Sequence, residues 1–85
     1  MYEIYTANSK VEKRLREYLE QRKDISDKLD KLRQKPRKAN EAHLLHGKLA
    51  GTWSCWLGSN IRILYIIDDD DKTIIIEAIG SHNIY

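Results

Sequence analysis

Two β-branched runs separated by an acidic turn constrain the fold of this chain more than any other feature. Residues 61–67 and 73–79 are rich in isoleucine, and residues 68–72 read Asp-Asp-Asp-Asp-Lys. Such runs favour strands, and a short polar connection between them favours an antiparallel hairpin. The four aspartates superficially suggest calcium, but the segment lacks the glycine and the distal glutamate of an EF-hand loop. We therefore interpret residues 68–72 as a solvated hairpin turn.

Two further strands are expected upstream. Residues 2–6 alternate around Ile4 and indicate a short opening strand. The apolar side chains of Trp53, Cys55 and Leu57 recur at every second position, and Gly-Ser-Asn at 58–60 indicates a turn. Both patterns are typical of strands with one buried face.

Apolar side chains at helical spacing predict two helices between these strands. Residues 9–22 form one amphipathic pattern, for which Asn8 and Ser9 are candidate N-caps and Ser9 with Glu12 fits a capping box. The second helix is expected to be capped by Asp24 and to end before Pro36. The apolar positions of the two helices are Val11, Leu15, Tyr18, Leu19, Ile25, Leu29 and Leu32. A connection of only a residue or two implies an antiparallel helical hairpin.

The expected fold is therefore α+β with the order β-α-α-β-β-β, a helical hairpin packed on a mainly antiparallel four-stranded sheet. A length of 85 residues without linker or repeat predicts one domain, residues 1–85. No apolar run approaches the roughly 20 residues of a membrane helix. The N-terminus lacks the features of a signal peptide, and Cys55 is the only cysteine. These features favour a cytoplasmic protein that does not contact membranes.

The charges are unevenly distributed along the chain. Residues 1–67 hold fourteen Lys and Arg against eight Asp and Glu, a net charge of +6, whereas residues 68–85 carry −4. Residues 28–38 are the densest basic segment, with six cations opposed only by Asp30. Such a run is either an ordinary solvated face or a nucleic-acid contact, and composition does not separate the two.

Residues with useful chemistry gather in the second half of the chain. Residues 43–53 read His-Leu-Leu-His-Gly-Lys-Leu-Ala-Gly-Thr-Trp, Arg62 and Tyr65 lie on the next strand, and the chain ends in Gly-Ser-His-Asn-Ile-Tyr. His82 titrates near neutrality, and Tyr85 can stack on a base or donate a proton. The plain alternative is that His82 caps the last strand while Tyr85 packs on the sheet edge.

Taken together, these segments resemble the RelE/ParE superfamily of toxins from toxin–antitoxin systems, and most closely its YafQ-like ribonuclease branch. The pattern His-x-Leu-x-Gly-x-Leu-x-Gly-x-Trp, Arg-x-x-Tyr and Gly-Ser-His-x-x-Tyr matches in order and spacing over residues 43–85. The resemblance implies a ribosome-dependent endoribonuclease that cleaves messenger RNA in the A site without a metal or other cofactor. It also implies a cognate antitoxin, with oligomers expected only as toxin–antitoxin complexes.

The resemblance also implies roles for individual residues. Cleavage by the RNA's own 2′-OH needs proton transfer, for which His82 and His43 are candidates, and stabilisation of phosphoryl charge, which suits Arg62. Tyr85 is expected to hold a base by stacking. The expected RNA-binding residues are Lys31, Lys35, Arg37, Lys38, Lys48 and Trp56. Trp56 lies where many relatives place an arginine, so base stacking replaces one phosphate contact or that contact is missing.

Each assignment has a structural alternative. Arg62 lies on the opposite strand face from Ile61, Ile63, Tyr65 and Ile67, and an isolated arginine there is simply an exposed charge. His43 equally fits a loop or capping histidine, and which histidine acts as base stays open. Tyr65 is expected in the core. His43, His46 and His82 superficially resemble a zinc site, but the sequence offers no supporting residues for the ligands, so no metal is expected.

Two rival functions share the expected fold. One is a ParE-like toxin that inhibits DNA gyrase without RNA chemistry, and the other is an RNA-binding or antitoxin-sequestering protein without catalysis. Fold does not decide among them. Arg62, His82 and Tyr85 favour the ribonuclease because they suit phosphodiester chemistry and have no evident use in blocking gyrase.

Overall fold

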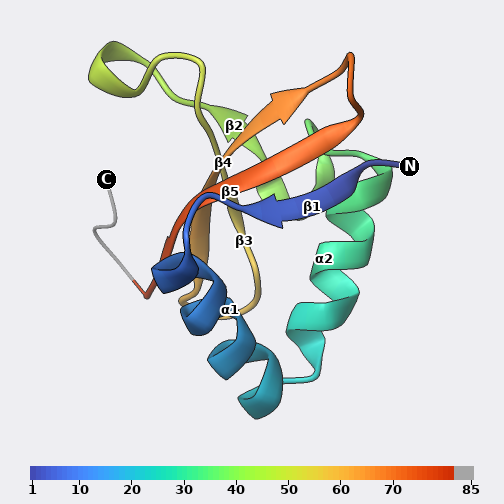
Figure 1. Cartoon of the computed structure of the whole chain (residues 1–85), viewed down its shortest axis with the longest axis vertical. Coiled ribbons are helices and arrows are strands. Elements are labelled where there is room, and N and C mark those ends of the chain that lie inside the picture. The colour runs from blue at the N-terminus through green and yellow to red at the C-terminus, as the bar shows by residue number, and fades with distance from the viewer. Residues whose placement is uncertain (82–85) are drawn as a thin grey trace.

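The computed structural model describes residues 1–81, so the candidate catalytic residues His82 and Tyr85 lie outside the described part of the chain. A helical hairpin lies against a sheet, as expected, and the α+β class is confirmed (Figure 1). The helices are α1 (Ser9–Gln21) and α2 (Asp24–Gln34), and the strands are β1 (Glu3–Thr6), β2 (His43–Leu44), β3 (Trp53–Trp56), β4 (Arg62–Asp68) and β5 (Thr73–Gly80). Two short 3₁₀ helices, η1 (Ala39–Glu41) and η2 (Gly47–Leu49), flank β2.

The sheet has five strands in the order β1-β5-β4-β3-β2, one more than expected. β1 runs parallel to β5, and the other three neighbouring pairs are antiparallel. The unexpected strand is β2, whose two residues pair with Ser54 and Trp53 of β3. Two exposed residues are too few to show alternation, so only their partners on β3 reveal them as a strand.

The helices cover one face of the sheet and bury most of its isoleucines against their own apolar stripes. The core includes Leu15, Ile25, Leu32, Ile63, Tyr65 and Ile76. Tyr65 is fully buried, and its hydroxyl donates a hydrogen bond of 2.7 Å to the Pro36 carbonyl. Its expected place in the core is confirmed, and the bond fastens the segment after α2 to the middle of β4.

The helix starts agree with expectation in part: Asn8, one of the two candidates, caps α1, whereas the capping box and the Asp24 cap do not form. Asn8 caps α1, accepting a 3.0 Å bond from the Val11 amide, while Glu12 pairs with Arg16 instead of closing a capping box with Ser9. Asp24 is the first residue of α2 and not its cap. Its carboxylate binds Arg22 at 2.9 Å through a charge-assisted bond.

Arg22 also connects the helical hairpin to the turn between β3 and β4. Its guanidinium donates to the Ser59 carbonyl at 2.9 Å, directly above Gly58. Gly58 has φ +110°, and a Cβ there would lie 2.6 Å from an Arg22 nitrogen. Only glycine satisfies both the backbone conformation and the close approach.

The acidic hairpin turn between β4 and β5 forms as expected. The Asp71 amide donates to Asp68 at 3.1 Å, and Lys72 adopts φ 55°, a left-handed conformation that closes the turn. Within residues 1–81, no group of His, Cys, Asp and Glu is arranged to hold a metal ion. No helix of the same part of the chain is long and apolar enough to cross a membrane.

Candidate functional site

Strand register places three of the features singled out in the sequence on one row across the sheet. Trp56 lies opposite Arg62 in the β3–β4 ladder, and Arg62 lies opposite Gly80 in the β4–β5 ladder. Directly opposed residues of antiparallel strands point to the same face. Ile61 and Ile63 flank Arg62 and are buried under the helices, so this row faces away from them.

Arg62 and Trp56 are in direct contact within this row. The Arg62 guanidinium carbon lies 4.2 Å from the centre of the Trp56 ring, and both residues are partly exposed. A stacked guanidinium is held in one plane, and a planar fork is the geometry in which arginine binds phosphate by two parallel hydrogen bonds. Trp56 therefore orients Arg62, the side chain that the sequence analysis assigned to phosphate binding.

Gly80 ends β5 directly opposite Arg62, and Ser81 is the last described residue. His82 follows Gly80 by two positions in the sequence. The described part of the chain thus ends one residue beyond the position opposite Arg62.

His43 lies on the same face of the sheet but in the adjacent row. It pairs with Ser54, which lies opposite Leu64, two residues beyond Arg62 on β4. Two strand spacings and two residues of strand rise place the backbones of His43 and Arg62 roughly 12 Å apart. At this separation the two side chains can contact different groups of a bound dinucleotide, but they do not converge on one atom.

A bend in which two residues adopt the left-handed backbone conformation leads the chain into β2, which begins at His43. Asn40 and Glu41 have φ of 57° and 60°, a conformation that asparagine tolerates but that is unfavourable for glutamate. The Asn40 side chain stabilises the bend by donating to the Lys28 carbonyl at 2.8 Å. His43 Nδ1 lies 3.3 Å from the Glu41 carbonyl oxygen, and the imidazole is exposed.

Ser54 is a residue of this face that sequence reasoning did not assign. It is fully buried between His43 and Leu64 in the cross-strand row, and its hydroxyl has no hydrogen-bond partner within residues 1–81. Buried hydroxyls without a partner are uncommon and often lie beside functional groups. The sequence signal was slight, a small polar residue at the alternate positions of an otherwise apolar strand.

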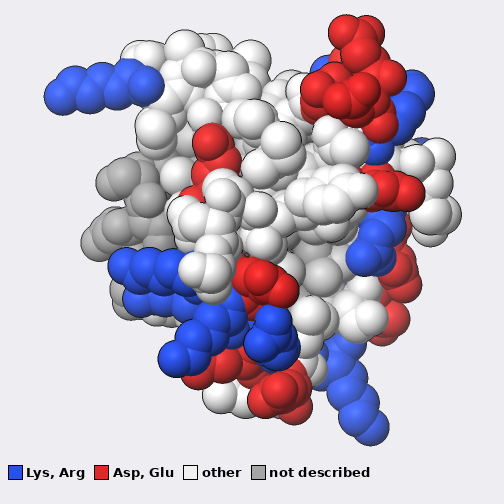
Figure 2. Space-filling view, viewed as in Figure 1, with Lys and Arg blue, Asp and Glu red and all other residues white. Residues whose placement is uncertain are grey.

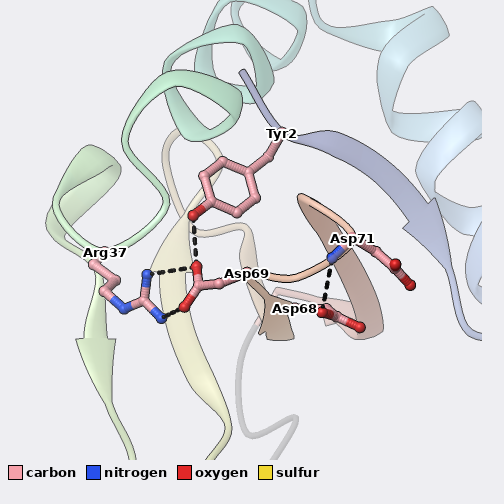
Figure 3. Close-up of polar contacts among 5 residues, drawn as sticks. All are labelled: Tyr2, Arg37, Asp68, Asp69 and Asp71. Atoms are coloured by element: carbon pink, nitrogen blue, oxygen red, sulfur yellow. Dashed lines mark hydrogen bonds and ion pairs between the residues drawn. The ribbon is translucent and has the colours of Figure 1, made fainter.

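The basic segment at residues 28–38 divides into two kinds of residue. Lys31, Lys35 and Lys38 are exposed, whereas Arg37 forms a two-pronged ion pair with Asp69 at 2.8 and 3.1 Å (Figure 3). The Tyr2 hydroxyl donates to the same carboxylate at 2.5 Å. Together, Arg37 and Tyr2 lower the pKa of Asp69 to about 2. The structure thus gives Arg37 an internal partner that the sequence did not reveal.

The Arg37 end of this basic segment does not lie beside Arg62, although Lys28 at its start lines an open pocket together with Trp56. Asp69 follows the far end of β4, and seven residues of strand rise separate it from Arg62 by roughly 23 Å. Lys48 is exposed on η2, in the loop that extends away from the sheet beyond β2 (Figure 1). Of the six expected RNA-binding residues, the structure brings Trp56 alone into contact with a candidate catalytic residue that it describes.

Cys55 adjoins the site in sequence but has no part in it. Its thiol is buried on the helical side of β3, and burial raises its pKa to about 12. A thiol in this state is neither a nucleophile nor a metal ligand at neutral pH.

Comparison with known proteins identifies related folds and a family. Residues 5–84 match the model of a family described as the ParE toxin of the type II toxin–antitoxin system, parDE. Among solved structures, the toxin of the YoeB–YefM complex from Staphylococcus aureus is 17% identical with a TM-score of 0.73, covering 98% of this chain and 99% of that one. No protein of curated function matches the sequence.

Two further structures show the same fold. The YoeB/ParE toxin from Agrobacterium tumefaciens is 14% identical with a TM-score of 0.75, covering 95% of this chain and 99% of that one. A chain of the RelBE2 toxin–antitoxin complex from Mycobacterium tuberculosis is 21% identical with a TM-score of 0.64, covering 95% and 98%. At these identities the likeness concerns the fold alone.

Proposed function

This chain belongs to the ParE toxin family of type II toxin–antitoxin systems, within the RelE/ParE superfamily, and from that premise we propose that it is a ribosome-dependent endoribonuclease. Its proposed substrate is messenger RNA in the ribosomal A site, and its proposed place of action is the cytoplasm. We assign it to the RNA-cleaving, YafQ-like side of the superfamily. No metal or cofactor takes part in the proposed reaction.

The observation that carries the proposal is the cross-strand row Trp56–Arg62–Gly80. It combines a stacked arginine, a partly exposed aromatic ring and the strand end that His82 and Tyr85 follow in the sequence. Phosphodiester cleavage requires a phosphate-binding cation, a group that transfers protons near neutral pH and a surface that holds a base. A purely structural arginine at the end of a strand needs none of these neighbours.

In the proposed reaction the 2′-oxygen attacks the adjacent phosphorus, and the bond to the leaving 5′-oxygen breaks. One of His82 and His43 removes the 2′ proton, and the other supplies a proton to the 5′-oxygen. Arg62 stabilises the charge that develops on the phosphoryl oxygens. Tyr85 and Trp56 hold the flanking bases by stacking, which contributes about 1–3 kcal/mol per base in single-strand binding proteins.

A cognate antitoxin is the proposed inhibitory partner. The S. aureus and M. tuberculosis relatives were solved as toxin–antitoxin complexes. We propose that the antitoxin of this chain acts by competing for Arg62 or by displacing the segment that carries His82 and Tyr85. A partner that folds on binding can cover several catalytic groups together.

The second candidate function, inhibition of DNA gyrase, is favoured by the family description, which names ParE. Two assays separate the functions. Purified toxin is added to translating ribosomes and the ends of the messenger RNA are mapped, and in parallel it is added to a gyrase supercoiling reaction. The ribonuclease proposal expects new RNA ends and unchanged supercoiling, and the reverse pattern contradicts it.

A further inference from the structure

An open cavity lies between the start of α1 and the end of β5. Its volume is about 350 Å³, and Lys10 and Arg14 from α1 line it together with Glu77, Ala78 and Ile79 from β5. The β1–β5 ladder ends where Thr6 meets Ile76, so β1 does not cover this last stretch of β5. The cavity is therefore bounded by a helix on one side and an uncovered strand edge on the other.

The two cations of this cavity lie on one face of α1, held against β5. They are four positions apart, a spacing that makes them neighbours on a helix surface at about 5–6 Å between Cβ atoms. One Arg14 nitrogen donates a long hydrogen bond of 3.4 Å to the Ile79 carbonyl, which brings the guanidinium to the rim. Figure 2 shows Lys and Arg side chains gathered over the first half of α1, with acidic side chains below them.

Arg14 differs from most other arginines of the described chain in lacking a carboxylate partner. Arg16, Arg22, Arg33 and Arg37 each pair with an Asp or Glu, whereas no carboxylate within residues 1–81 forms an ion pair with Lys10 or Arg14. Glu77 lines the same cavity, and no ion pair among the described residues joins it to Lys10 or Arg14. Within residues 1–81, no direct ion pair therefore neutralises the positive charge of Lys10 and Arg14.

The position of the cavity relates it to the Arg62 row. Ile79 directly precedes Gly80, which lies opposite Arg62, so a single strand spacing of about 4.8 Å separates β4 from the strand that forms the cavity wall. Arg62 lies on the face away from the helices, so a polynucleotide held there has to pass around the uncovered edge of β5 to reach Lys10 and Arg14. Arg37, by contrast, binds Asp69 near the far end of β4.

We propose that Lys10 and Arg14 bind the phosphodiester backbone of single-stranded RNA next to the Arg62 site. The identity of the ligand rests on the proposed function, whereas the site itself rests on the cavity, the guanidinium at its rim and the unpaired charges. Glu77 weakens this binding by repulsion and limits how tightly the backbone is held. No sequence pattern distinguished these two cations, because the end of β5 lies 65 residues from Arg14 along the chain.

The test measures binding of a fluorescein-labelled oligouridylate at several salt concentrations, in a His82→Ala background that excludes cleavage. Each single-strand phosphate contact contributes about 0.7 to the slope of log K against log salt. Lys10→Gln with Arg14→Gln is expected to lower that slope by about 1.4, whereas Glu77→Gln is expected to tighten binding. Lys10→Arg with Arg14→Lys keeps both charges and is expected to keep the slope.

The matched control is Lys13→Gln with Lys23→Gln, which removes the same charge from exposed positions that do not line the cavity. Equal slopes for the control and the cavity variant contradict the proposal, because bulk charge then explains the effect. Unchanged RNA binding with weakened antitoxin binding also contradicts it and assigns the surface to the protein partner. Thermal melting of each variant by circular dichroism establishes that it is folded.

Cleavage on translating ribosomes is measured with His82 restored. If the unaltered chain cuts no RNA, the proposed function fails while the oligouridylate slopes still decide the phosphate site. If it cuts RNA and the cavity variant shows an unchanged slope, the phosphate site alone is wrong.

Discussion

The Arg62 guanidinium carbon lies 4.2 Å from the centre of the Trp56 ring, on the sheet face that the helices leave uncovered. This contact joins two residues to which the sequence assigned separate tasks, phosphate binding and base stacking. A guanidinium held against an aromatic ring loses less conformational freedom when it binds phosphate than an unsupported one. The pair is therefore expected to act as a unit, and substitution of either residue should reveal the role of the other.

Arg62→Lys is expected to lower RNA cleavage by about 10²–10³, the cost of removing one preorganised donor in other enzymes. Lysine keeps the charge but loses both the planar fork and the stacking geometry. Trp56→Phe should retain most activity, and Trp56→Ala should lose about tenfold or more because orientation and base stacking are lost together. Initial rates on programmed ribosomes measure these effects, and full activity of Arg62→Lys contradicts the role of Arg62.

The exposed lysines near the end of α2 should contribute to ribosome binding in a way that Arg37 does not. Changing Lys31, Lys35 and Lys38 to Gln should weaken ribosome binding and flatten its salt dependence. Adding Arg37→Gln should flatten it no further, because that guanidinium is already paired with Asp69. Filter binding over a salt series measures this, and a further clear drop in slope with Arg37→Gln shows that its charge reaches RNA.

The Asp69 carboxylate should make stability depend on pH in acid. Its pKa is lowered to about 2 by Arg37 and Tyr2, below the ordinary value of about 3.9. A depressed pKa stabilises the fold above the unfolded value, and that contribution is lost as pH falls through the folded value. Urea midpoints of wild type and Asp69→Asn should therefore converge between about pH 4 and pH 2.

Asp70→Asn removes the same charge from an exposed neighbour in the same turn and serves as the control for Asp69→Asn. At neutral pH the Asp69 variant should have the lower urea midpoint of the two. Equal midpoints indicate that the Arg37–Asp69 pair adds nothing to stability, as holds for many exposed pairs.

The features that sequence predicted well are those determined by local pattern. The buried faces were identified by the helical spacing of Val11 and Leu15 and by the alternation of Ile61 and Ile63. A face that is buried must carry apolar residues at the repeat of its own helix or strand. The acidic turn also formed as expected, since a short polar connection between two strong strands leaves few alternatives. Local pattern likewise placed Arg62 on the face away from the core.

The features that sequence missed depend on contacts between distant residues. Arg37 and Asp69 are 32 positions apart, and no local signal shows that they meet. β2 exists only because β3 offers a pairing edge, and Asp24 binds Arg22 in preference to capping its own helix. The contact of Arg62 with Trp56 similarly needed the register between β3 and β4, which alternation alone does not determine.

Cys55 should react with thiol reagents only when the protein opens. With a pKa raised to about 12, its thiolate at pH 8 is roughly a thousandfold scarcer than that of an ordinary cysteine. Labelling with dithionitrobenzoate is therefore expected to be slow in the folded protein and rapid in urea. Rapid labelling of the folded chain contradicts the buried position of the Cys55 thiol.

Messenger RNA end mapping on translating ribosomes is the decisive measurement for the ribonuclease account. Wild type and the His82→Ala, Arg62→Ala double variant are added to the same translation reaction, and new 5′ ends are located relative to the reading frame. The account expects ends at a fixed position within A-site codons with wild type and their absence with the folded double variant. Equal cleavage by both proteins, or growth arrest by wild type without any new RNA ends, contradicts the account.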